Sequence, residues 1–245
     1  MILLRRLLPI ALLLPTAAGA DWLSGNAGLA SDTLFRGLDQ TNTPALQGGL
    51  DYARDDGYYA GGWASNNRSA GSGGELDLYG GASKPLTLLG ELAAHLDLGA
   101  IGYLYSGERS PALGGGSQDF AEVYAGLGAG PASFKVYVTP DYAGRDAPGF
   151  YLQGTLKYPL GRGYTLRGSL GWSLGGGVDR QISYLTADGR GRPYLDYAAR
   201  LDKSLRWGLT AWVEVAGTDL HLADGAQGGG GQPKFVAGLR KDFDF

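Results

Sequence analysis

FVAGLRKDFDF, residues 235–245, alternates in steps of two, with large apolar side chains at Phe235, Leu239, Phe243 and Phe245. The residues between them are mostly small or polar. Period-two alternation predicts a β-strand with one apolar face and one polar face. A large apolar side chain is seldom left in a fraying terminus. The stretch therefore predicts a strand whose apolar face lies against something apolar up to Phe245.

The same alternation recurs along the chain and predicts about twelve strands. Most of them have the roughly 9–11 residues that a tilted strand needs to cross a bilayer. No helical 3.6-residue stripe competes with these segments. The predicted strands cover residues 22–36, 45–54, 58–66, 75–83, 90–105, 119–128, 132–139, 149–158, 164–174, 194–201, 206–218 and 234–245.

The connections alternate between long and short after the first strand. Short ones such as DDG (55–57), GAGP (128–131) and PLGRG (159–163) predict tight turns, whereas the long ones are polar and glycine-rich. This alternation is typical of outer-membrane barrels, with long loops on one side only. A soluble β-sandwich would also alternate but leaves the one-sided loop lengths unexplained. The fold class predicted for residues 21–245 is all-β, a transmembrane up-and-down antiparallel β-barrel of outer-membrane type.

Aromatic residues gather near the predicted strand ends and suggest the two interfacial belts of such barrels. The belt near the short turns would comprise Trp22, Tyr52, Tyr58, Tyr158, Tyr164, Trp207 and Phe243. The belt near the long loops would comprise Phe35, Trp63, Tyr105, Phe150 and Trp172.

Residues 1–20, MILLRRLLPIALLLPTAAGA, have a short basic region, an apolar run and small residues before Asp21. This pattern predicts a secretory signal peptide cleaved before Asp21, and the general secretory route. No later segment holds 18 consecutive apolar residues, so no transmembrane helix is expected. The predicted location is the bacterial outer membrane, with its lipid as a partner. A chain with a formal charge of -3 does not suggest nucleic acid as a partner.

The terminal aromatics suggest a second partner. Phe243 and Phe245, at alternate positions of the last strand, resemble the signal by which barrel-assembly machinery recognises its clients. We therefore expect that machinery to engage the C-terminal strand.

The stretch SDTLFRGLDQTNTPALQGGLDYARDDGYYAGGWASN, residues 31–66, resembles the TorF family of outer-membrane porins, a family otherwise described as of unknown function. Similar stretches are ELDLYGGAS at 75–83 and DFAEVYAGLGAGPASFKVYVTPDYAG at 119–144. The resemblance implies a signal-bearing outer-membrane barrel that passes solutes. It implies no substrate and no catalytic residue.

A barrel of this size encloses room for a narrow aqueous path unless loops fill it. Selectivity would come from inward side chains, and the expected passengers are small polar or charged solutes. The candidate acidic lining residues are Asp51, Asp77, Asp97 and Glu122, with Glu75 beside them. The candidate basic lining residues are Lys135, Lys157, Arg167, Arg200 and Arg240, with Arg206 beside them, and Arg36 at the external end of the first strand.

Two interpretations of these charges remain open. Acidic and basic walls could face each other and orient solutes, or the charges could pair with neighbours and neutralise the interior. Arg36 could guard the entrance or hold the first long loop by pairing with an acid such as Asp39 or Asp51.

Enzymatic and metal-dependent functions are not predicted. The two histidines, His95 and His221, are distant in sequence, and cysteine is absent. His95 and Asp97 share a face, but no serine is placed as a nucleophile beside them. We expect no catalytic residue, no metal site and no cofactor. The alternative to a channel is a closed structural or adhesin-like barrel that binds a partner through its extracellular loops.

Overall fold

The computed structural model describes residues 21–41, 43–66, 73–88, 90–223 and 233–245. Two short strands and twelve longer ones make up nearly all of its regular structure. The longer strands are β1 (Trp22–Ala30), β4 (Ala45–Ala53), β5 (Tyr58–Ser65), β6 (Glu75–Leu88), β7 (Leu92–Tyr105), β8 (Phe120–Ala129), β9 (Ala132–Thr139), β10 (Gly149–Gly161), β11 (Tyr164–Leu174), β12 (Tyr194–Ser204), β13 (Leu209–Thr218) and β14 (Lys234–Asp244).

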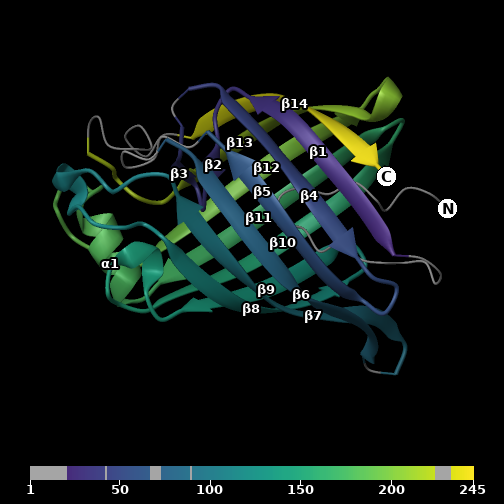
Figure 1. The fold of residues 1–245 in the computed structure, drawn as a ribbon, viewed down its shortest axis with the longest axis horizontal. Coiled ribbons are helices and arrows are strands. Elements are labelled where there is room, and N and C mark those ends of the chain that lie inside the picture. Colours follow the sequence, from purple (N-terminus) through teal and green to yellow (C-terminus); the bar gives the residue numbers. More distant parts are fainter. Residues whose placement is uncertain (1–20, 42, 67–72, 89, 224–232) are drawn as a thin grey trace.

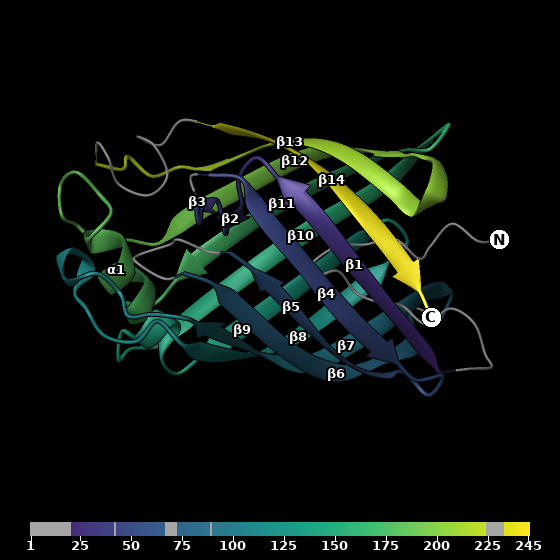
Figure 2. The ribbon, with the colours of Figure 1, turned by 45° about the horizontal axis from the view of Figure 1, so that its top comes forward.

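These twelve strands form one closed antiparallel barrel, in which each strand pairs with its sequence neighbours and β1 pairs with β14 to close the ring (Figure 1). The predicted fold class is confirmed. Tight turns and the C-terminus lie at one end of the barrel, which we call the turn end. The long connections and helix α1 (Gly176–Ser183) lie at the other, the loop end (Figures 1 and 2).

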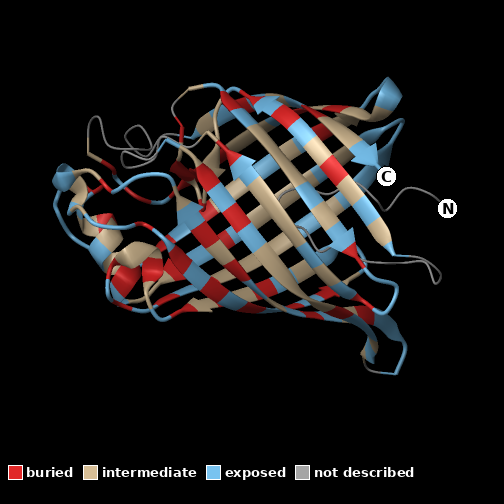
Figure 3. Cartoon of the chain, viewed as in Figure 1, coloured by how far each residue is buried: buried red, intermediate tan, exposed pale blue. Residues whose placement is uncertain are grey.

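Exposure alternates along the strands, as the sequence predicts (Figure 3). On β14, Phe235 is 83% exposed and Phe243 is 41% exposed, whereas Val236 and Arg240 between them are buried. Phe245, beyond the last strand, is 75% exposed. The outer surface of the barrel is therefore apolar, and its interior carries the polar and charged residues.

The predicted aromatic belt at the turn end is largely present on the outside, but the belt at the loop end is partly wrong. Phe150 and Trp172 face outward and are exposed. Phe35 and Tyr105 instead pack against the buried cluster inside the barrel. Trp63 pairs in register with Asp77, whose side chain is buried, so it also faces inward. Period-two alternation divides a strand into two faces. Where both faces carry aromatic residues, the alternation does not show which face lies on the outside of the barrel.

Several predicted strand boundaries are also wrong. The strands predicted to end at residues 83, 158 and 201 continue to Leu88, Gly161 and Ser204. The first strand ends at Ala30, and the residues after it form a separate hairpin of β2 (Leu34–Phe35) and β3 (Leu38–Asp39). The strand predicted to start at residue 206 begins at Leu209, because Arg206 belongs to the short 3-10 turn η4 (Arg206–Gly208). Arg206 is exposed in that turn and lines no wall.

The predicted signal peptide, residues 1–20, lies outside the described residues. In the described part of the chain, no helix has the length and apolar character needed to cross a membrane.

Candidate functional site

The β2–β3 hairpin lies inside the barrel at the loop end and forms a plug. At its tip, Gly37 adopts a φ of 75°, in the left-handed region that glycine tolerates best. A Cβ atom added there would lie 2.6 Å from Thr218 Cγ2, 2.7 Å from the Gly217 carbonyl oxygen and 2.9 Å from Asp196 Cβ. The tip therefore sits directly against the wall formed by β12 and β13.

The neighbouring residue, Arg36, reaches toward the wall of β8, β9 and β10. Its Nη2 atom donates to Glu122 Oε2 at 2.5 Å. Its Cζ atom lies 4.0 Å from the ring centroid of Tyr151, 5.6 Å from that of Tyr142 and 5.7 Å from that of Tyr137. We call Glu122, Tyr137, Tyr142 and Tyr151 the cation cage, because aromatic faces and a carboxylate are the groups that attract a guanidinium.

Arg36 is charged and enclosed in this position. Its side chain is 4% exposed and that of Glu122 is 0% exposed. Burial alone would lower the pKa of Arg36, but Glu122 and the surrounding tyrosines outweigh burial and raise the pKa above its ordinary value. The expected partners Asp39 and Asp51 are wrong, because Arg36 pairs with Glu122, which lies 86 positions away in sequence.

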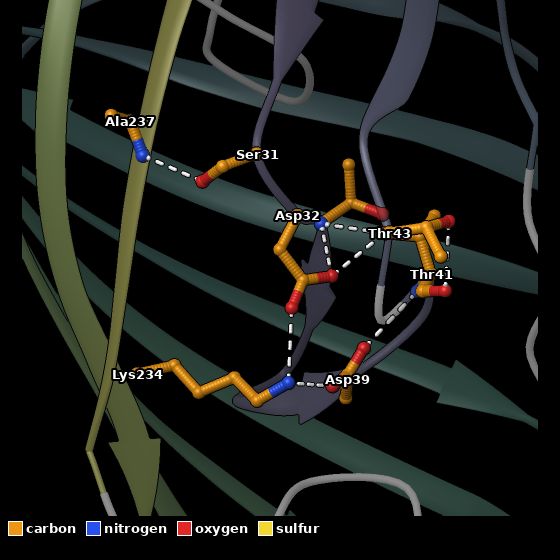
Figure 4. Close-up of polar contacts among 8 residues, drawn as sticks. Ser31, Asp32, Asp39, Thr41, Thr43, Lys234 and Ala237 are labelled. Carbon is orange, nitrogen blue, oxygen red and sulfur yellow. Dashed lines mark hydrogen bonds and ion pairs between the residues drawn. The ribbon is translucent and has the colours of Figure 1, made fainter.

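The base of the hairpin is tied to β14, the strand that pairs with β1 in the ring (Figure 4). Lys234, the first residue of β14, contacts Asp39 and lies 3.0 Å from Asp32 Oδ2. The Thr41 hydroxyl donates to Asp32 Oδ1 at 2.7 Å, and the Thr41 backbone N–H donates to Asp39 Oδ1 at 3.1 Å. The plug is thus anchored both at its tip and at its base.

Apolar side chains fill the space around the plug. Leu38 of the hairpin joins a buried cluster with Tyr103, Tyr142 and Tyr194. Val178 and Ile182 of α1 belong to the same cluster and are fully buried. In this structure the loop end of the lumen is packed like a protein core rather than left open.

Two buried arginines hold the long connections together over this core. Arg109 donates to the carbonyl oxygens of Gly115, Ser117 and Ala143. Arg145 donates to the Leu113 carbonyl oxygen at 2.8 Å and to Gln181 Oε1 at 2.7 Å. Burial, together with the nearby Arg109, lowers the pKa of Arg145 to about 10, so it remains charged near neutral pH.

Four buried carboxylates surround the plug, each within the first three residues at the loop end of its strand. We call them the acidic ring: Glu75, Asp77, Glu122 and Asp196. Tyr105 donates to Glu75 Oε1 at 3.0 Å, and Tyr151 donates to Asp196 Oδ1 at 3.1 Å. Within this ring, Glu122 forms a salt bridge with Arg36. The wall around the plug is therefore lined by carboxylates, whereas the basic side chains Arg109 and Arg145 lie in the connections over it.

The middle of the lumen is more evenly balanced. Lys135 Nζ lies 2.7 Å from Asp97 Oδ2, and both side chains are buried. Tyr59 donates to Asp97 Oδ1 at 2.6 Å. Gly126 of β8 lies in register between Asp97 of β7 and Lys135 of β9. Because Gly126 has no side chain, the methylenes of Lys135 can cross over it to reach Asp97. Asp51, another predicted lining residue, accepts a hydrogen bond from Tyr79.

A second charged group lies on β10 to β14. Asp202 binds two arginines at once, contacting Arg167 through Oδ2 and Arg200 through Oδ1 at 2.7 Å. The Arg200 Cζ atom lies 4.0 Å from the Trp212 ring centroid. Asp202 was not predicted, because it lies just past the predicted strand end at residue 201, whereas β12 continues through Ser204.

The remaining predicted lining residues lie close by. Arg240 pairs with Asp242 at 2.9 Å on the same strand, and Lys157 faces the same wall. In the middle and turn half of the lumen, five acidic residues oppose five basic ones: Asp51, Asp97, Asp202, Glu214 and Asp242 against Lys135, Lys157, Arg167, Arg200 and Arg240. No group of His, Cys, Asp or Glu within the described ranges is arranged to hold a metal ion.

Comparison with solved structures places this geometry among porin barrels. The KdgM porin is 9% identical with a TM-score of 0.53, covering 90% of this chain and 98% of that one. The NanC porin is 10% identical with a TM-score of 0.54, with the same two coverages. Identities this low show a shared fold only.

Comparison by sequence gives a family. No curated protein matches the chain. A family model described as "Bacterial protein of unknown function (Gcw_chp)" matches residues 15–236. The TorF name suggested by residues 31–66 stays a prediction. The chain belongs to the Gcw_chp family of bacterial proteins of unknown function, and it has the barrel fold of porins.

Proposed function

We propose that this protein is a porin-like channel of the bacterial outer membrane that passes small polar or charged solutes by passive diffusion, without catalysis. The observation that carries the proposal is the lumen lined by charge inside an apolar barrel. Arg167 and Arg200 keep 17% and 15% of their side-chain surface exposed. Charged groups that stay in contact with water inside a barrel are the usual lining of an aqueous path.

The cellular part of the proposal rests on the sequence. Residues 1–20 would direct the chain through the general secretory route and be cleaved before Asp21. Phe243 and Phe245 at the turn end would be engaged by the barrel-assembly machinery. The turn end would then face the periplasm and the loop end the exterior, as in outer-membrane barrels generally.

The pairing of lumen charges bears on how solutes are selected. The Lys135–Asp97 and Arg167–Asp202–Arg200 contacts favour local neutralisation over two opposed charged walls in the middle of the lumen. Carboxylates are instead concentrated in the acidic ring around the plug. One solved KdgM structure holds disordered oligogalacturonate, a chain of carboxylates. An acidic entrance would disfavour such a solute here and favour neutral or cationic ones.

A closed structural or adhesin-like barrel is the second candidate, and the packed plug is the observation that favours it. Single-channel current from refolded residues 21–245 in a planar bilayer separates the two. Discrete steps that scale with salt concentration support a channel. Silence from verified, folded protein, including a variant that lacks the plug tip contacts, supports the closed barrel.

A charge reversal refines the channel experiment. Arg167→Glu should shift the reversal potential under a salt gradient toward cation selectivity, because it adds negative charge to the wall. Arg54→Glu, in an exposed turn, is the matched control and should leave it unchanged. The same shift in both variants would remove Arg167 from the selectivity-determining residues.

A further inference from the structure

The cation cage is occupied by the protein's own side chain. Three of its members lie on the barrel wall, and the fourth, Tyr142, lies in the 3-10 turn η3 (Tyr142–Gly144) between β9 and β10. None of them belongs to the hairpin that carries Arg36. The cage is therefore formed entirely by residues outside the hairpin.

Arg36 does not use all that the cage and its surroundings offer. Glu122 Oε1 and Asp196 Oδ2 are buried and accept no hydrogen bond from any described residue, and Arg36 Nη1 donates none. Asp196 adjoins the cage through its hydrogen bond with Tyr151. Buried carboxylate oxygens without donors are costly. A guanidinium that is not tethered to the hairpin could turn its donors toward both oxygens, which Arg36 does not do.

The hairpin tip is also conformationally strained. Arg36 has a φ of 50° and Gly37 a φ of 75°. A left-handed conformation is unfavourable for a residue with a side chain, so the contacts of the cage must offset it. A cation that displaces Arg36 from the cage would allow the hairpin tip to leave this left-handed conformation.

We propose that the cation cage, together with Asp196, is a binding site for solutes that carry a guanidinium group, and that Arg36 fills this site when no solute is present. The inference rests on the proposed channel function, because the ligand would be a solute entering from the loop end. Such a solute would be drawn by the acidic ring, stack on Tyr151 as Arg36 does, and displace the plug tip.

The test is equilibrium binding of radiolabelled agmatine, a small guanidinium amine, to folded protein in detergent micelles. Arg36→Ala vacates the cage and should bind agmatine at least about tenfold more tightly than the unaltered protein, whose site is occupied. Adding Glu122→Gln should weaken that binding by about tenfold, because it removes the charge-assisted acceptor. Adding Asp202→Asn instead, which removes a carboxylate in the other half of the lumen, should change it by less than about twofold.

Equal binding by the Arg36→Ala variant and the unaltered protein would overturn the proposal. So would equal weakening by Glu122→Gln and Asp202→Asn, since that would indicate general lumen charge rather than a site. If Arg36→Ala does not fold, hydrogen exchange of unaltered protein replaces it. Agmatine should then accelerate exchange in residues 34–39 and glutarate should not. Unchanged exchange at saturation would overturn the proposal.

The binding experiment and the channel experiment fail separately. Agmatine binding by protein that never conducts would overturn the channel and leave the cage as a binding site. Conduction without agmatine binding would overturn the site and leave the channel.

Discussion

Arg36 and Glu122 form a buried ion pair, Nη2 to Oε2 at 2.5 Å, that joins the plug to the barrel wall. Removing one partner of such a pair leaves a buried charge and costs about 3–5 kcal/mol where the structure cannot relax. If the tip leaves the wall once the pair is broken, the loss is smaller, so we expect Glu122→Leu to lower the free energy of unfolding by an amount at or below that range.

The double variant Arg36→Met/Glu122→Leu should lose less than the sum of the two single variants, because neither charge is then left alone. Urea unfolding of protein refolded into lipid vesicles measures all three. Strictly additive losses would contradict a direct interaction between the two side chains.

A substitution at Gly37 should displace the plug tip from the wall without removing a charge. Gly37→Ala places a methyl group within 2.9 Å of β12 and β13 atoms, at a φ where alanine is already strained. We expect the tip to leave its seat and the single-channel conductance to rise while the barrel stays folded.

Gly161→Ala is the matched control for this variant. Gly161 has a φ of 84°, but an added Cβ would meet nothing within 4 Å. It should show a similar small loss of stability, about 1 kcal/mol, without a change in conductance. A rise in conductance in both variants would show that the backbone strain of an alanine at positive φ, and not the contact of the plug tip with β12 and β13, causes the change.

Lys234 should matter more than its position at a strand end suggests. Lys234→Met removes the cation shared by Asp32 and the buried Asp39, so the hairpin base should loosen. We expect faster hydrogen exchange in residues 31–41 and a loss of about 1–3 kcal/mol. Lys241→Met on the same strand removes exposed contacts with the Trp207 carbonyl oxygen and the Phe243 ring, away from the hairpin, and should change neither. Identical behaviour of the two variants would argue against a latch at the base.

The barrel was predictable because each strand has one face toward an apolar surrounding and the other toward the polar interior. Alternation such as Leu166, Leu170 and Leu174 against Arg167 and Ser169 records the outer and inner environments residue by residue. Antiparallel neighbours joined by tight turns then fix the order of the strands without information about distant contacts.

The plug was not predictable, because its contacts are long-range. The apolar residues Leu34 and Phe35 follow closely on the first strand, so that strand is predicted to continue to residue 36. The available signals were Asp32, whose carboxylate accepts from the Thr33 N–H, and Gly37, which permits a tight tip. Nothing local indicates that Arg36 meets Glu122, since pairing across a lumen depends on how the ring closes.

Asp202 provides a test of the lumen charge balance. Its carboxylate bridges Arg167 and Arg200, so Asp202→Asn leaves two cations with no shared anion. The reversal potential under a salt gradient should shift toward anion selectivity. Asp55→Asn, in an exposed turn, should leave the potential unchanged. A shift toward cations in the Asp202 variant would mean that the arginines do not line the conducting path.

The lipid-facing surface can be mapped by depth. Leu170 lies mid-strand on β11 and is 70% exposed, whereas Phe235 lies near the loop end of β14 and is 83% exposed. In a bilayer, Leu170→Arg should lower the free energy of unfolding from the membrane by about 2–4 kcal/mol, because arginine near the midplane is poorly solvated. Phe235→Arg should cost only about 0–1 kcal/mol beyond the loss of the ring, because an interfacial arginine reaches water. Refolding into vesicles across a urea series measures both. Equal costs at the two positions would contradict a membrane band centred on the barrel, and with it the outer-membrane location.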